Sequence, residues 1–141
     1  AQGKLEEAEP LYQQCLAVTK KVLGPDHPDT LMSMGNLANL LKTLGKLEEA
    51  APLFQQCLAG KTKVLGPKHP STLLSMYNFA ILLETKGDFT NAETQARQSL
   101  DGYFFLGLKA DVKDGVRQLT GILRGQGKHE EAVVVEQTYS N

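Results

Sequence analysis

GPDHPDTLMSMGNLANLLKTLGKLEEAAPLFQQCLAGKTKVLG, residues 24–66, is the stretch that decides the fold, because much of it returns 42 residues later. Residues 25–28 (PDHP) recur at 67–70 as PKHP, and residues 36–38 (NLA) recur at 78–80 as NFA. Gly3, Gly45 and Gly87 lie 42 residues apart, and Gly127 follows 40 residues later. A fixed period between about 20 and 50 residues is typical of a solenoid, in which each unit packs on the next. The sequence therefore predicts a stack of repeats.

Each repeat is predicted to be a pair of helices, because apolar residues recur at helical spacing and Gly-Pro pairs or single glycines interrupt them. Pro28 suits the first position of a helix, and either Asp26 or His27 could cap that helix. Asp111, followed by Asp114, predicts the start of the sixth helix. The expected helices span residues 4–23, 28–44, 47–65, 70–86, 88–105, 112–125 and 128–139. The expected units are a partial repeat at 1–24, two full repeats at 25–66 and 67–105, and a degenerate C-terminal capping repeat at 106–141.

The first helix of each pair is predicted to be buried on more than one side. Met34, Leu37, Ala38 and Leu41 form one stripe at 100° per residue, with further leucines beside it. The helix at 4–23 has no such partner before it. We therefore expect part of its apolar face to be exposed, or covered by other chain, and we expect these residues to belong to a longer chain or a complex.

These residues resemble tetratricopeptide repeats, in particular the long variety found in kinesin light chains. The family's small residue in the first helix matches Ala38 and Ala80, and its Ala-x3-Phe in the second helix matches Ala50 and Phe54. The long variety is similar in its Leu-Gly-x-x-His-Pro connector, at 23–28 and 65–70. The resemblance implies an all-α solenoid of antiparallel helix pairs in a right-handed superhelix. It also implies a peptide or protein partner, held in a concave groove that the first helices line.

The rotation of the first helices, set by their apolar stripe, predicts which residues face this groove. Asn36, Asn78 and Gln118 would form a ladder of side-chain amides, one in each repeat, able to bond the backbone of an extended peptide. The same amides could instead bond neighbouring helices within the array, and the two uses are weighted equally. Lys42, Arg117 and Arg124 would attract acidic groups of a partner. The predicted partner-binding residues are Asn36, Asn39, Lys42, Tyr77, Asn78, Arg117, Gln118 and Arg124.

A binding module that serves as a scaffold or adaptor is the preferred function. The alternative is a structural segment of a large assembly, which contacts its neighbours through outer faces and ends. Near-identical repeats favour this alternative slightly, because copies without specialisation suggest spacing rather than recognition.

Composition and motifs argue against several other classes of function. The formal net charge is −1, which gives no electrostatic reason to expect nucleic acid or an anionic membrane as a partner. His27 and His69 lie in successive connectors, roughly 10 Å apart by helix stacking, so they are expected to cap helices rather than share a metal. No catalytic motif is present, and we predict neither enzyme activity nor a cofactor. Cys15 and Cys57 are predicted to be reduced core residues of a cytoplasmic protein.

Overall fold

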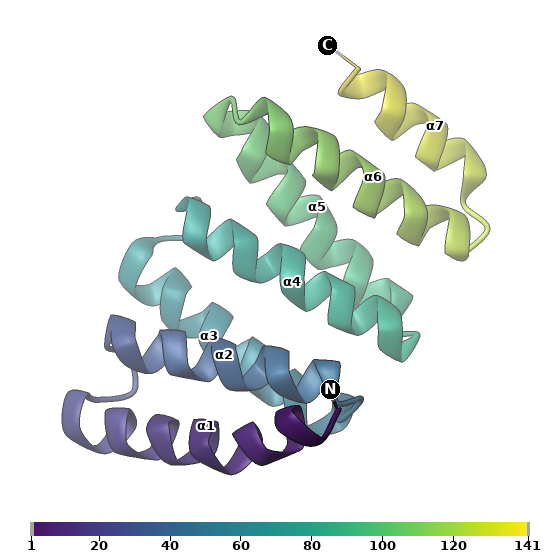
Figure 1. Ribbon diagram of the computed structural model, residues 1–141. Helices are drawn as coiled ribbons and strands as arrows, with labels where there is room; N and C mark the ends of the chain where they lie inside the picture. Colours follow the sequence, from purple (N-terminus) through teal and green to yellow (C-terminus); the bar gives the residue numbers. More distant parts are fainter. Residues whose placement is uncertain (1, 141) are drawn as a thin grey trace. The chain divides into compact units, whose positions relative to one another are not determined.

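A computed structural model describes the backbone of residues 2–140 and the side chains of residues 3–140. Its secondary structure there is helical, without strands (Figure 1). The prediction of an all-α fold is thus confirmed. The helices are α1 (Gln2–Leu23), α2 (Pro28–Thr43), α3 (Leu47–Leu65), α4 (Pro70–Lys86), α5 (Phe89–Leu106), α6 (Lys109–Gly125) and α7 (His129–Thr138).

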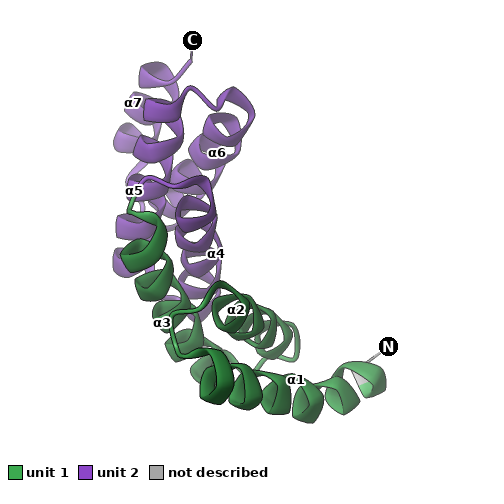
Figure 2. Ribbon diagram, turned by 90° about the vertical axis from the view of Figure 1, so that its left-hand side faces the viewer, with its two compact units in different colours: residues 1–67 green, residues 68–141 purple. Residues whose placement is uncertain are grey.

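The chain divides into two compact units, residues 1–67 and 68–141 (Figure 2). In the first unit α1 packs on α2 and α2 packs on α3. In the second unit α4 packs on α5, α5 on α6 and α6 on α7. Each helix therefore packs mainly on its neighbours along the chain within its unit, as expected for stacked repeats.

Histidine side chains cap the N-terminus of the first helix in two repeats. His27 Nδ1 accepts a hydrogen bond from the backbone N–H of Asp29 at 3.1 Å, and His69 Nδ1 accepts one from Ser71 at 3.0 Å. Pro28 and Pro70 follow at the first helical positions, where a missing N–H leaves no bond unmade. The cap of α2, which the sequence left open between Asp26 and His27, is therefore His27.

Small residues set how closely the helices of a pair approach. Ala38 in α2 and Ala80 in α4 are completely buried. Gly60 in α3 and Gly102 in α5 occupy the same repeat position, and a Cβ built on either would overlap with a leucine of the preceding helix, Leu31 or Leu73. The second half of α3 thus crosses the first half of α2 in direct contact, and α5 crosses α4 in the same way.

The sixth helix begins earlier than the sequence predicted. α6 starts at Lys109 rather than at residue 112, and Asp111 lies in its first turn. Gly107 adopts a left-handed conformation (φ 71°) that ends α5, and the next residue, Leu108, already accepts the first bond of α6 from the Val112 N–H at 2.9 Å. The prediction treated Asp111 as a side-chain cap, but its carboxylate instead complements the positive end of the helix dipole.

Candidate partner-binding surface

The face of α2 opposite its packed side carries three of the predicted partner-binding residues. Leu37, Ala38 and Leu41 are buried, whereas Asn36 and Asn39 are exposed and Lys42 is half-buried. No hydrogen bond joins the Asn36 side-chain amide to another described residue. The donor and the acceptor of this amide are therefore both available to an external partner.

A small cavity of about 150 Å³ lies beside Asn36 in the first unit. It is lined by Tyr12 and Cys15 of α1 together with Ser33 and Asn36 of α2. Cys15 Sγ and Ser33 Oγ are 3.5 Å apart across it. Tyr12 and Cys15 were not among the predicted site residues, because they lie on the second helix of a pair and the predicted residues all lie on first helices.

α4 presents the equivalent residues in the second unit, with Tyr77 and Asn78 half-buried on its surface. Burial raises the pKa of the Tyr77 hydroxyl, and the nearby Asp114 carboxylate adds to this effect, so Tyr77 is a neutral donor at pH 7. Leu74, one turn before Asn78, is 51% exposed. Met32 in α2 holds the same repeat position and is 60% exposed. Each unit therefore offers an exposed apolar side chain beside an asparagine.

Gln118 of α6 differs from the asparagines at the same repeat position, because it is buried. Its Nε2 donates a hydrogen bond to the backbone carbonyl of Tyr77 at 2.9 Å. Its Oε1 is buried with no hydrogen-bond partner. This amide joins α6 to α4, so it serves the array itself, which is one of the two uses that the sequence left open.

Both arginines of the predicted site already have carboxylate partners. Arg117 is paired with Asp114 of the same helix at 3.5 Å, and Arg124 is paired with Glu136 of α7 at 2.6 Å. Both pairs are exposed to solvent, and such pairs contribute at most about 1 kcal/mol. Lys42 forms no ion pair with a described residue. Of the three predicted cations, Lys42 is therefore the one without a carboxylate partner among the described residues.

The described residues contain no group of three or more His, Cys, Asp or Glu side chains that could hold a metal ion. His27 and His69 are instead used as helix caps, through the Nδ1 bonds given above. Within residues 3–140 neither Cys15 nor Cys57 forms a disulfide, and Cys57 is buried whereas Cys15 is exposed. Cys15 is thus not the core residue that the sequence predicted, because it borders the open cavity beside Ser33 of α2 and stays exposed.

The outer face of α1 is apolar and exposed, as expected for a helix without a preceding partner. Leu11, Val18 and Val22 are exposed by 65%, 54% and 72%. In α3 the positions that correspond to Leu11 and Val18 hold the half-buried Leu53 and the buried Gly60, because α2 packs there. The α1 face is thus a second surface on which another chain could pack.

Comparison with known proteins identifies the repeat. The sequence profile described as "Tetratricopeptide repeat" matches residues 1–63 and 45–103. The chain belongs to the tetratricopeptide repeat family. The repeat of this family is generally a protein–protein interaction module, and the predicted resemblance is confirmed.

Solved structures share this tetratricopeptide fold over nearly the whole chain. The crystal structure of BtubC (BKLC) from P. vanneervenii matches with a TM-score of 0.89 at 18% identity, covering 98% of this chain and 56% of that one. The Podosopora anserina putative kinesin light chain nearly identical TPR-like repeats match with a TM-score of 0.89 at 26% identity, covering 97% of this chain and 66% of that one. A point variant of the latter protein matches equally well. The chain thus spans between about half and two thirds of these solved chains.

Two further findings bear on the class of protein. No curated protein sequence matches this chain. None of the helices in the described part of the chain is long and apolar enough to span a bilayer.

Proposed function

We propose that this tetratricopeptide chain is a scaffold or adaptor that binds a peptide or protein partner through the exposed face of α2 in the first unit and through those of α4 and α6 in the second. The observation that carries the proposal is the pair Asn36 and Asn78. Neither side-chain amide bonds a described residue, although both occupy the repeat position at which Gln118 is used internally. Amides that the array does not use are available to a partner.

The chemistry of these faces favours an extended segment with apolar side chains. An amide donates and accepts at once, so Asn36 and Asn78 can each bond a backbone N–H or C=O without reading the sequence of the partner. Met32 and Leu74 stand exposed beside them and would contact the partner's apolar side chains. Lys42 adds a preference for a carboxylate. Arg117 can add to this preference by leaving its ion pair with Asp114 and pairing with a carboxylate of the partner. Breaking the Arg117–Asp114 pair costs little free energy, because the pair is exposed to solvent.

The proposal is tested by selecting short peptides against the 141-residue chain from a random display library, and titrating the selected peptides against variants. The double variant Asn36→Ala with Asn78→Ala should keep its helicity and melting temperature and bind several-fold more weakly. Gln98→Ala, an exposed change on α5, is the matched control and should bind normally. If the double variant folds and binds as the wild type does, the partner lies elsewhere. If it unfolds, the amides serve the fold.

The exposed stripe on α1 favours a second candidate function, as a structural part of an assembly. Leu11, Val18 and Val22 would be covered there by a neighbouring subunit or by a further helix. Sedimentation of the wild type and of Val22→Glu tests this candidate. Assembly that the charge abolishes supports it, and a monomer at all concentrations contradicts self-assembly through this face.

A further inference from the structure

The helices α2 and α4 are near copies of each other that differ on one side. Residues 30–43 (TLMSMGNLANLLKT) align with residues 72–85 (TLLSMYNFAILLET) without a gap. The buried positions are identical, except that Phe79 replaces Leu37. Apart from one exchange of a methionine for a leucine, the remaining changes alter the chemistry of the side chain. They are Gly35 to Tyr77, Asn39 to Ile81 and Lys42 to Glu84.

These three positions lie along one side of each helix. They are spaced i, i+4 and i+7, which places them within about 60° of one another at 100° per residue. None of them is buried: in α2 the asparagine is exposed and the other two residues are half-buried, and in α4 all three are half-buried. The two copies are therefore the same where they pack and different where they meet solvent. This difference favours recognition of a partner over spacing as the role of these helices.

The charge on this side has opposite sign in the two helices. Lys42 makes the face of α2 positive, and Glu84 makes the face of α4 negative. Neither side chain forms an ion pair with a described residue. Arg124, which holds the equivalent position in α6, is paired with Glu136 of α7 at 2.6 Å. Lys42 and Glu84 are therefore both available to pair with charges of a partner.

The surroundings of Tyr77 in α4 favour a basic side chain. Burial raises the pKa of the Tyr77 hydroxyl, and the carboxylates of Asp114 and Glu84 raise it further, whereas the Arg117 guanidinium lowers it. Two negative groups and one positive group thus act on this hydroxyl. Ile81 lies between Tyr77 and Glu84 along the helix. A lysine or arginine can cover such an apolar residue with its methylene groups while its charged end reaches a carboxylate.

The face of α2 favours an acidic side chain instead. Gly35 has no side chain in the place of the Tyr77 ring, and Asn39 puts an exposed amide in the place of Ile81. Asn39 and Lys42 are three residues apart on a helix, so their side chains are neighbours. An amide N–H and an ammonium group can donate hydrogen bonds to the same carboxylate.

We propose that the partner carries charges of both signs, a lysine or arginine for the face of α4 and an aspartate or glutamate for the face of α2. The basic side chain lies over Ile81 with its charged group at Glu84. The acidic side chain is bound by Lys42 and Asn39. This inference rests on the proposed function, because it names the side chains of the partner that these faces select. The two asparagines that the helices share bond the backbone of any segment, whereas the charges distinguish one partner from another.

Charge-reversal variants of the 141-residue chain test the proposal. Peptides are selected from a random display library against the wild type, Glu84→Lys and Lys42→Glu, and their sequences are compared. The wild type should select peptides that contain both basic and acidic residues. Glu84→Lys should lose the enrichment in lysine and arginine, and Lys42→Glu should lose the enrichment in aspartate and glutamate. The matched controls Glu7→Lys and Lys21→Glu change exposed charges on α1 by the same amount and should select the same peptides as the wild type.

Titration of one selected peptide gives the size of the effect. A fluorescent copy of a peptide selected by the wild type is compared, by anisotropy, with a copy in which glutamate replaces the basic residue. The replacement should weaken binding to the wild type roughly fivefold, the effect of one partly exposed ion pair. It should strengthen binding to Glu84→Lys. Glu84→Gln, which removes the charge and keeps the size, should bind both peptides about equally, and it decides the assignment if Glu84→Lys unfolds.

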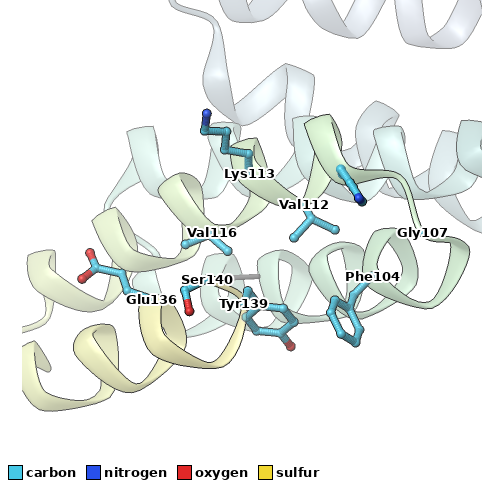
Figure 3. A pocket seen from close by; sticks show the side chains of 9 residues that line it. Phe104, Gly107, Val112, Lys113, Val116, Glu136, Tyr139 and Ser140 are labelled. Carbon is cyan, nitrogen blue, oxygen red and sulfur yellow. The ribbon is translucent and has the colours of Figure 1, made fainter.

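A pocket of about 470 Å³ in the second unit offers peptides another place to bind (Figure 3). It lies where α5, α6 and α7 meet, its lining includes Phe104, Val112, Val116 and Tyr139, and none of its lining residues belongs to α4. Phe104→Ser changes the wall of this pocket and should leave the selected peptides unchanged. Selection that changes with Phe104→Ser and not with Glu84→Lys places the peptides in the pocket and overturns the proposal.

The remaining outcomes separate this inference from the proposed function. Peptides that need Asn36 and Asn78 but show no enrichment in basic residues contradict the charge assignment alone, and so do peptides that bind Glu84→Lys unchanged. Peptides that bind the double variant Asn36→Ala with Asn78→Ala as well as the wild type contradict the proposed function, and the charge assignment with it. The same holds if the wild type selects no peptide.

Discussion

Gly102 gives the sharpest test of how closely α5 crosses α4. A Cβ at this position would lie 2.8 Å from Leu73 Cδ1 and closer still to Cδ2, and Leu73 is only 1% exposed. Alanine in place of glycine gains up to about 1 kcal/mol of helix propensity. Forcing a methyl group into this contact costs about 1–3 kcal/mol. Gly102→Ala should therefore change stability by between about zero and 2 kcal/mol, in the destabilising direction.

Gly121 is the matched control, because it lies within α6 with open space around the position of a Cβ. Gly121→Ala should stabilise the chain by about 0.5–1 kcal/mol. The two variants should thus differ by about 1–3 kcal/mol in urea unfolding, or by several degrees in melting temperature. Gly60→Ala repeats the test in the first unit, against Leu31. If Gly102→Ala stabilises as much as Gly121→Ala does, the helices do not approach as closely as described.

The remaining predictions concern the core, one ion-pair cluster and one buried amide. Ala80→Leu, at a completely buried position, should cost about 1–3 kcal/mol in urea unfolding, and an unchanged midpoint would mean that this face of α4 is not packed. Burial raises the pKa of the Glu93 carboxyl, but hydrogen bonds from Gln126, Lys128 and Arg97 outweigh it and lower the pKa from 4.5 to about 2. The stabilisation from Glu93 is at most about 3 kcal/mol; it should be present above pH 4.5 and be lost as the pH falls towards 2. Glu93→Gln should remove this part of the dependence of unfolding on pH. A pH profile identical to that of the wild type would contradict the prediction. Gln118→Ala should destabilise the chain by about 1 kcal/mol, because the hydrogen bond to the Tyr77 carbonyl is lost. Asn78→Ala should not have this effect. Equal unfolding midpoints for the two variants would show that the bond contributes nothing.

The repeat period predicted most of the fold from sequence alone. Copies such as the PDHP and PKHP connectors set the helix boundaries, and α3 and α4 begin and end at the predicted residues. The prediction of helix boundaries was wrong where the sequence does not repeat. The connector at 107–111 lacks the His-Pro pair of the other connectors. The start of α6 was therefore predicted from a candidate capping side chain, Asp111. The helix begins at Lys109 without a side-chain cap, because Gly107 alone is sufficient to end α5 there.

The candidate site was less predictable, because helical periodicity gives the direction of a side chain but not its partners. Asn36 and Gln118 hold the same repeat position, yet one is exposed and the other buried. Gln118 has one more methylene, and it reaches the backbone carbonyl of Tyr77. Likewise Arg124 was predicted to contact a partner, whereas in the structure it forms an ion pair with Glu136 of α7. Such contacts depend on distances between helices, which a repeat pattern does not contain.

The ten-residue length of α7 has a consequence for the order in which helices of the second unit open. α7 packs along α6, and Tyr139, the residue that follows α7, donates a 2.9 Å hydrogen bond to Asp101 of α5. A helix of ten residues is too short to persist without its neighbours. Its backbone amides should therefore exchange their hydrogens with solvent well before those of α5. Deuterium uptake in residues 129–138 therefore reports a local opening of the second unit that precedes the opening of α5.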